Sequence, residues 1–202
     1  MATRESRTPP AHQRLIEAAF EEFSTKGIAG TTTRSIAERA GCNEVTLFRH
    51  FGAKEALLEA SVAHAAADLL DVCHLRGLAT GDLLADLRRF AGIYDDVMTR
   101  TEGIARAIIG ETKNLPDGVL AFLGTILDRF HGAMGDYLQD QIGAGKVATD
   151  LDLALLTQSF TGTLTMGTFR RSVGHLPGEH LAWLDHVASL YHAALTGGRA
   201  AC

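Results

Sequence analysis

The sequence predicts an all-α fold in two parts, a small N-terminal three-helix domain and a larger C-terminal helical domain. Apolar residues recur at helical spacing along almost the whole chain. No segment alternates apolar and polar residues with the period that marks a half-buried strand. Glycine or proline separates most of the helical segments. Together these patterns predict about nine helices and no sheet.

The composition is that of a folded protein in water. The chain has 202 residues, of which 46% are hydrophobic and 21% are charged, and its mean hydropathy is +0.06. This balance excludes a disordered chain and a membrane protein. The longest uncharged stretch, Leu153–Phe169, contains five threonines and is expected to be a buried helix rather than a membrane span. Residues 1–10 lack the apolar core of a signal peptide, and three widely spaced cysteines fit a reducing compartment, so we expect a cytoplasmic protein.

The first expected helix begins at Pro9 and Pro10 and ends at Gly27. Proline suits the first turn of a helix because no hydrogen bond from its nitrogen is needed there. Glycine is common just past the last turn because it tolerates a left-handed backbone. The apolar stripe of this helix consists of Ile16, Ala19, Phe20 and Phe23.

Two short helices are expected next, at residues 34–40 and 44–50. Threonines can cap the first of them, and Asn43 can cap the second. Gly41 lies in the short turn between them and can adopt a positive φ. Two short helices joined by such a turn form a helix-turn-helix, here residues 33–51.

The second part of the chain opens with a long helix from about Lys54 to Leu75. The break at Gly52 is the expected boundary, which gives a helix-turn-helix domain at 1–53 and a second domain at 54–202. The further helices are expected at 83–97, Thr101–Lys113, Pro116–Gly143, Asp150–Arg171 and Glu179–Leu195.

Charge is distributed unevenly between the two parts. Residues 1–54 contain eight Lys and Arg against six Asp and Glu, whereas residues 55–202 contain eleven against eighteen. The balances of +2 and −7 add up to the net charge of −5. A basic N-terminal part favours a nucleic-acid partner there, although ordinary scatter of charge gives the same pattern.

Polar residues gather on and around the outer face of the helix at 44–50. A helix that enters the major groove needs side chains for base edges near its N-terminal end and flanking groups for phosphates. The motif by itself leaves DNA binding and a purely structural role open. These polar residues are Asn43, Glu44, Thr46, Arg49 and His50.

Residues 23–57 resemble the N-terminal domain of the TetR family of bacterial transcriptional regulators. The matching segments read G-I-A-G-T-T-T-R-S-I-A-E-R-A-G and T-L-F-R-H-F-G-A-K-E-A-L, and the second is the more specific. A weaker match at 143–154 resembles the loop and the start of the eighth helix of that family. The resemblance implies a regulator that is not an enzyme. It implies a homodimer that binds a palindromic operator in double-stranded DNA, acts as a repressor and is released by a small-molecule effector.

The resemblance also implies roles for individual residues. Thr33 matches a phosphate contact at the start of the second helix, and His50 and Lys54 match further phosphate contacts. The recognition helix begins to read bases at Glu44. With the polar residues of the outer face, the full set of predicted DNA contacts is Thr33, Arg34, Asn43, Glu44, Val45, Thr46, Phe48, Arg49, His50 and Lys54.

Three of these residues leave alternatives open. Phe48 stands where the family often has tyrosine, so it lacks a hydroxyl for phosphate but can press on a thymine methyl group or a sugar. Glu44 can accept a hydrogen bond from a cytosine amino group or stabilise the N-terminus of its helix. Arg49 can reach a phosphate or remain solvated.

Candidates for an effector pocket come from the central helices of the second part. Such pockets are mostly apolar and contain a few polar groups that orient the ligand. Each candidate can instead be an ordinary core residue, and Glu111 is a further polar candidate. The pocket set is Phe90, Tyr94, Glu102, Arg106, Phe122, Phe130, Met134, Tyr137, Phe160, Thr161, Thr165, Met166 and Phe169.

The last two helices are expected to pair with their symmetry mates in a four-helix interface. The uncharged segment Leu153–Phe169 supports this, because a surface helix of a monomer carries charges on one side. The expected interface residues are Leu153, Leu156, Phe160, Trp183, Val187, Leu190 and Tyr191.

Other kinds of site find little support in the sequence. The common hydrolase, zinc-protease and redox motifs are absent, and the G-x-G-x-x-A at 143–148 follows a helix rather than a strand. His64, Cys73 and His74 share one helix without metal-binding spacing. We therefore expect no cofactor and no metal. Two alternatives remain, a small-molecule-binding protein or enzyme whose helix-turn-helix does not bind DNA, and a module that docks a protein.

Overall fold

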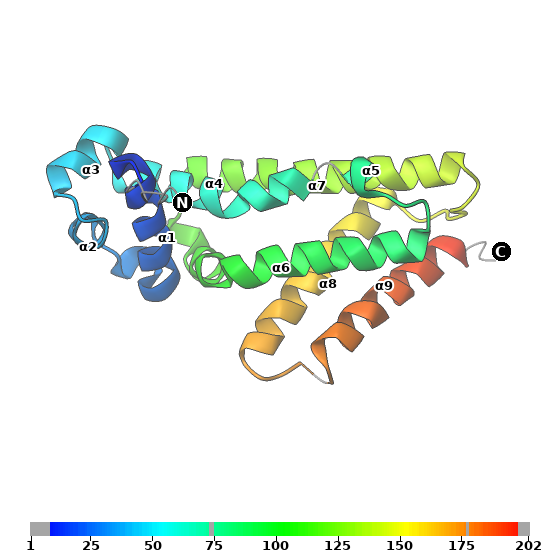
Figure 1. Cartoon of the computed structure of the whole chain (residues 1–202). Coiled ribbons are helices and arrows are strands. Elements are labelled where there is room, and N and C mark those ends of the chain that lie inside the picture. The colour runs from blue at the N-terminus through cyan, green and yellow to red at the C-terminus, as the bar shows by residue number, and fades with distance from the viewer. Residues whose placement is uncertain (1–8, 73–74, 177, 198–202) are drawn as a thin grey trace, which may run out of the picture. The chain divides into compact units, whose positions relative to one another are not determined.

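The computed structural model describes residues 9–72, 75–176 and 178–197, and every regular element in these ranges is a helix (Figure 1). The predicted all-α fold is confirmed. In the described ranges, no helix is both long enough and apolar enough to span a membrane. The elements are α1 (Ala11–Gly30), α2 (Thr33–Arg39), α3 (Glu44–Phe51), α4 (Lys54–Val72), α5 (Leu75–Leu78), α6 (Leu83–Gly110), the 3-10 helix η1 (Thr112–Asn114), α7 (Asp117–Gly143), α8 (Leu153–Ser172) and α9 (His180–Thr196).

Two predicted helix starts are wrong. Thr101 does not begin a helix but lies inside α6, where its hydroxyl donates to the carbonyl of Val97 at 2.8 Å. A threonine bonded in this way is satisfied within an uninterrupted helix and gives no stop signal. The helix expected from Asp150 begins instead at Leu153, because the side chain of Asp152 accepts two backbone hydrogen bonds of the first turn.

The chain forms two compact units, each built from two stretches of sequence. The first unit contains residues 1–65 and 103–122, and the second contains 66–102 and 123–202. The beginning of α4 and the end of α6 thus belong with α1, α2 and α3. The functional boundary predicted after residue 53 remains a prediction.

The core of the first unit lies among α1, α2 and α3, which Figure 1 shows gathered together. The buried residues Leu15, Ile36 and Leu47 come from these three helices in turn, and none of them exposes any surface. Thr32 caps α2 by accepting from the backbone N–H of Ser35, whose hydroxyl in turn accepts from the N–H of Thr32. This reciprocal capping box fixes where α2 begins.

The peptide groups around Ile28 are held by two other helices. The backbone leaves helical geometry at Gly27, where φ is 75°, and α1 then continues for a short distance. The carboxylate of Glu111, just after α6, accepts hydrogen bonds from the N–H groups of Ile28 at 2.7 Å and Ala29 at 2.8 Å. Lys54 of α4 donates from Nζ to the carbonyl of Ile28 at 2.5 Å. N–H groups freed by a break in a helix bind a carboxylate well because they carry partial positive charge.

The core of the second unit contains aromatic pairs between α6 and α7. The ring centroids of Phe90 and Tyr137 lie 5.1 Å apart, and those of Tyr94 and Phe130 lie 5.3 Å apart. The buried Asp86 accepts from the Tyr137 hydroxyl at 2.7 Å and from two backbone N–H groups of the preceding turn. Burial raises the pKa of Asp86, but these hydrogen bonds outweigh burial and leave the pKa below its ordinary value.

A second buried carboxylate joins α6 to α8 and α9. Asp95 accepts from the Thr168 hydroxyl at 3.0 Å and from Arg171 at 3.3 Å, and it lies 2.7 Å from Nε2 of His180. Figure 1 shows α8 and α9 side by side and joined by a short loop. Because one carboxylate has partners on both helices, Asp95 fixes the position of this pair against α6.

Glu22 joins α1 to α2 from a buried position. Its carboxylate lies 2.6 Å from Lys26 Nζ and 2.8 Å from Arg39 Nε, and the side chain is only 2% exposed. The hydrogen bond from Lys26 is the main cause that lowers the pKa of Glu22 to about 2, against an ordinary value of 4.5. The charged form is therefore favoured in the folded protein.

The Glu22 cluster predicts a loss of stability in acid. Because the folded pKa is the lower one, the contribution is complete above pH 4.5 and disappears as the pH falls toward 2. We expect Glu22→Gln to reduce the free energy of unfolding by about 2 kcal/mol at pH 7 and by much less at pH 3. Urea unfolding at both pH values measures this. The exposed Glu17→Gln is the control, and a Glu22→Gln effect that is equal at both pH values would contradict the prediction.

The hydrogen bonds to Glu111 predict a second change in stability. In Glu111→Gln the amide nitrogen cannot accept, so one of the N–H groups of Ile28 and Ala29 loses its acceptor. We expect a loss of about 1–2 kcal/mol in thermal or urea unfolding. Glu38→Gln is the matched control, because Glu38 forms an exposed pair with Arg34 that contributes little. If both variants unfold alike, the Glu111 contacts do not stabilise the first unit.

Candidate nucleic-acid interface

The turn between α2 and α3 has the geometry that the sequence predicts. Gly41 has a φ of 62°, and the N–H of Cys42 donates to the carbonyl of Ala37 at 2.9 Å. Arg14 of α1 donates from Nε to the carbonyl of Ala40 at 3.0 Å. These backbone bonds fix the angle at which α3 leaves α2, and they attach the turn to α1.

The polar residues at the start of α3 are bonded within the first unit. The side-chain oxygen of Asn43 accepts from both the N–H and the hydroxyl of Thr46, each at 2.8 Å, which confirms Asn43 as the cap of α3. The hydroxyl of Thr33 donates to the Glu44 carboxylate at 2.5 Å. The predicted DNA contacts Thr33 and Glu44 therefore hold α2 and α3 together.

The outward positions of α3 combine two apolar and two basic residues. Val45 is 76% exposed and Phe48 is 47% exposed, while Leu47 on the inner face is fully buried. Arg49 and His50 are also exposed. Because residues three and four apart share a face of a helix, Val45, Phe48 and Arg49 form one line, which we call the outer stripe of α3.

Two of the predicted phosphate contacts have partners inside the first unit. The Lys54 ammonium, besides its bond to Ile28, lies 6.0 Å from the ring centroid of Phe23. His50 lies beside His12 of α1, with ring centroids 5.8 Å apart. Arg34 forms its exposed pair with Glu38 at 2.9 Å. A contact of Lys54 or His50 with phosphate, and of Arg34 with DNA, stays a prediction.

Most of the predicted pocket residues lie in the core of the second unit. The hydroxyl of Tyr94 lies 2.8 Å from that of Thr165, and burial raises the pKa of Tyr94. His131, which the sequence analysis missed, lies 2.9 Å from the hydroxyl of Thr161, and burial lowers its pKa. No motif marks His131 in the sequence. The fully or nearly buried candidates are Phe90, Tyr94, Phe130, Met134, Tyr137, Phe160 and Thr161.

The remaining pocket candidates do not form one buried group. Arg106 and Phe122 belong to the first unit, and Arg106 is exposed. Met166 is 57% exposed on α8. Glu102 and Phe169 are half-buried. Glu111 is engaged by backbone N–H groups in the first unit, so its carboxylate serves the fold.

The predicted interface residues divide into two groups. Leu156, Phe160 and Val187 are buried within the single chain, where they join α8 and α9 to the core. Leu190 is 59% exposed, and Leu153, Trp183 and Tyr191 are half-buried. Helical periodicity could not distinguish the inner from the outer face of α8, because both faces lack charge. Further large apolar side chains exposed on α8 and α9 are Leu155, Met166 and Leu181.

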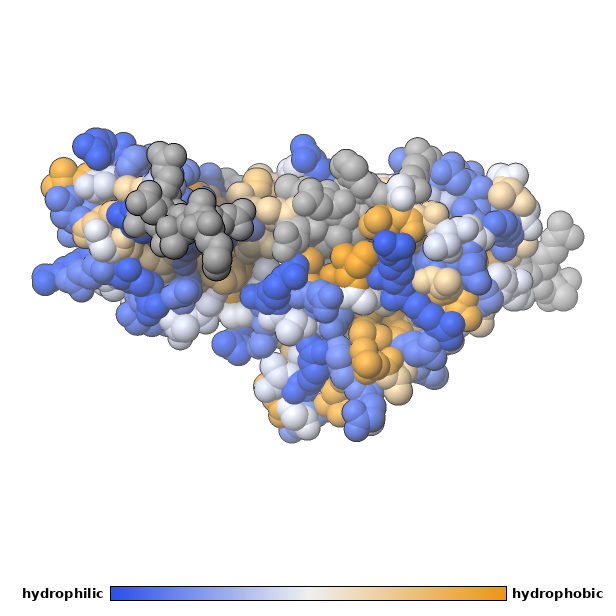
Figure 2. Space-filling view, viewed as in Figure 1, coloured by the Kyte–Doolittle hydropathy of each residue, from blue (hydrophilic) through white to orange (hydrophobic). Residues whose placement is uncertain are grey.

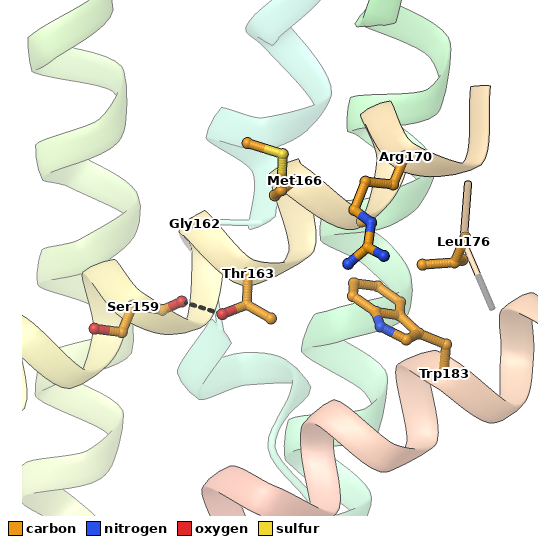
Figure 3. Close-up of a pocket in the computed structure, with 8 residues that line it drawn as sticks. Ser159, Gly162, Thr163, Met166, Arg170, Leu176 and Trp183 are labelled. Carbon is orange, nitrogen blue, oxygen red and sulfur yellow. Dashed lines mark hydrogen bonds between the residues drawn. The ribbon is translucent and has the colours of Figure 1, made fainter. Parts of the chain in front are cut away.

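Figure 2 shows apolar residues among polar ones in the region of α8 and α9. A hollow of about 490 Å³ lies on this pair of helices and is lined by Ser159, Met166, Arg170 and Trp183, among others. Figure 3 shows Arg170 and Trp183 at one end of it. A Cβ at Gly167 would lie 1.9 Å from the Trp183 ring, so only glycine lets this ring pack against α8.

No group of three or more potential metal ligands occurs in the part of the chain that the structure describes. Cys73 and His74, which the sequence analysis considered with His64, lie outside the described residues.

Comparison with known proteins identifies relatives of this chain. Residues 15–61 match the family model for bacterial regulatory proteins of the tetR family. The HTH-type transcriptional regulator YvkB of Bacillus subtilis is 35% identical over 189 residues, which cover 90% of this chain and 95% of that protein. BetI of Burkholderia lata, also an HTH-type transcriptional regulator, is 36% identical over 84 residues, 41% of this chain and 43% of that protein.

Solved structures share the fold. The TetR family regulator PfmR from Thermus thermophilus superposes with a TM-score of 0.69 at 22% identity. The superposition covers 92% of this chain and 100% of PfmR. FadR from Bacillus subtilis, solved in complex with stearoyl-CoA, gives a TM-score of 0.76 at 18% identity, with 91% and 98% covered. Given the full-length relative and the family match, this chain belongs to the TetR family of bacterial transcriptional regulators, which are DNA-binding proteins rather than enzymes.

Proposed function

We propose that this regulator binds a palindromic operator as a homodimer and represses transcription until a small-molecule effector releases it. The observation that carries the proposal is the capped α3, which presents Val45, Phe48 and Arg49 outward from a buried three-helix core. A helix held in this way can enter the major groove of B-DNA, which is about 12 Å wide. The exposed Arg49 and His50 would then face phosphates.

The homodimer would form through the exposed side of α8 and α9. A two-fold interface uses the same patch on both copies, so it must be self-complementary. Leu155, Met166 and Leu190 are each more than half exposed on these helices. No charged residue lies between Leu153 and Phe169, which suits a face that a second copy of the chain covers.

The effector site would lie in the second unit, near the aromatic side chains of α6 and α7. The polar pairs Tyr94–Thr165 and His131–Thr161 each link one of these helices to α8. Such pairs provide the few polar groups that orient a ligand among apolar walls. The lowered pKa of His131 favours a neutral ring, which can both donate and accept a hydrogen bond.

Release from DNA would be a shift of population between two arrangements of the protein. The helices α4, α6 and α7 each contribute residues to both compact units. An effector that binds more tightly to one arrangement of these helices favours that arrangement, and only this difference in affinity can alter DNA binding. The two recognition helices must keep the spacing of successive major grooves, about 34–36 Å, to bind one operator.

Selection from a random duplex pool tests the DNA-binding role. We expect one palindrome to be enriched and bound tightly by the wild type at near-physiological salt. Arg49→Ala should weaken binding about tenfold and reduce the slope of log K against log salt by about one, since one phosphate contact is lost. The control is Arg89→Ala on α6, whose guanidinium is exposed in the second unit. A chain that enriches no sequence is not a sequence-specific regulator.

Charge reversal of the apolar face tests the dimer. We expect Leu155→Glu with Leu190→Glu to weaken self-association at least tenfold in analytical ultracentrifugation, because a buried carboxylate without a partner is costly. Affinity for the full palindrome should fall in parallel. Leu127→Glu on α7, where the leucine is 41% exposed, is the matched control. Dimers that survive the double substitution would place the interface elsewhere.

A further inference from the structure

The outer stripe of α3 combines high exposure with apolar chemistry. Val45 and Phe48 expose 76% and 47% of their surfaces. The inner positions of the first unit are filled by other, fully buried residues. Contact between these two apolar side chains and water is unfavourable. Burial of both side chains against an apolar partner surface would lower the free energy.

The polar side chains at the start of α3 are engaged in hydrogen bonds within the first unit. The Asn43 oxygen holds both the N–H and the hydroxyl of Thr46, and the Thr33 hydroxyl holds Glu44. Reading a base with the Asn43 oxygen would break two bonds that cap α3. The residues that reach outward without such a cost are Val45 and Phe48, followed on the same face by Arg49.

The major groove presents one apolar group to a protein, the methyl group of thymine. We infer that Val45 and Phe48 read two thymine methyl groups in each half-site, which makes this regulator selective for the 5-methyl group of pyrimidines. The inference rests on the proposed function, since it specifies what α3 recognises. The exposed Arg49 of the stripe and the exposed His50 beside it favour a polyanion over an apolar protein surface.

The spacing of the two residues fits neighbouring base pairs. Three residues of α-helix rise by about 4.5 Å, and stacked base pairs are separated by about 3.4 Å. The long ring of Phe48 and the short branched side chain of Val45 differ in reach, so they can meet methyl groups at different distances from the axis of α3. The half-site should therefore contain two thymines in adjacent or nearly adjacent pairs, on either strand.

Deoxyuridine substitution tests the inference on the whole protein. The operator selected from the random pool is synthesised with each thymine of a half-site replaced in turn by deoxyuridine, which removes only the methyl group. At two positions we expect the dissociation constant to rise about three- to fivefold, the value of one buried methyl group. Replacing both thymines in both half-sites should weaken binding about 80- to 600-fold, if the four losses are independent.

Variants assign each methyl group to its side chain. Val45→Ala should weaken binding to the thymine operator and abolish the penalty of deoxyuridine at one position only. Phe48→Ala should do the same at the other position. Ile109→Ala, which truncates a side chain 59% exposed on α6, is the matched control and should keep both penalties. Circular dichroism confirms that each variant is folded.

The outcomes separate this inference from the proposed function. An enriched operator that tolerates deoxyuridine at every thymine, within twofold, overturns methyl reading and leaves the regulator intact. Penalties that are unchanged in both Val45→Ala and Phe48→Ala overturn it as well, because the methyl groups then meet other residues. Failure to enrich any operator contradicts the proposed function itself, and the stripe would then be a candidate for docking a protein.

Discussion

The hydrogen bonds of Ile28 hold the helix-turn-helix to the helices that leave it. Its N–H and that of Ala29 meet the Glu111 carboxylate, and its carbonyl meets the Lys54 ammonium, so α1, the start of α4 and the end of α6 share one point. The left-handed φ of Gly27 makes this possible, since it turns two N–H groups out of the helical ladder. The helices also approach closely at Gly103, where a Cβ would lie 2.7 Å from that of Ser24. Any change in the end of α6 must therefore alter these bonds or move α1.

Polar side chains that bond within the fold also stabilise α3. A short helix gains little stability from its own length, so its caps and its packing determine whether it forms. Asn43 caps it, and the bond from Thr33 to Glu44 links its first turn to α2. These side chains stabilise the fold, and the outer stripe of α3 is left as the proposed recognition surface. Substitution of the exposed Val45 or Phe48 is therefore expected to cost little stability, whereas substitution of Asn43 removes the cap of α3.

The sequence was sufficient to predict the helices and the helix-turn-helix because those features follow from local chemistry. Gly41, the cap at Asn43 and the apolar spacing are all visible within a few residues of one another. Contacts between distant residues were not predictable. Glu111 was considered as a ligand group, but it meets backbone groups 82 and 83 positions away. The buried faces of α8 were likewise ambiguous, because the stretch Leu153–Phe169 has no charged side to mark the outside. Thr101 suggested a helix start only because its bond to Val97 is invisible in sequence.

These contacts bear on how the proposed effector would act. The helix α6 is uninterrupted from Leu83 to Gly110. It carries Asp95, bound to α8 and α9, and it leads directly into Glu111, bound to α1. A helix without a break transmits a shift along its axis or a rotation more readily than a local bend, since bending it breaks backbone hydrogen bonds. The predicted break at Thr101 would have separated the two carboxylates with a flexible joint. In the proposed function, an effector near Tyr94 would contact the same helix that leads into Glu111, so a different position of α6 would disturb the bonds at Ile28.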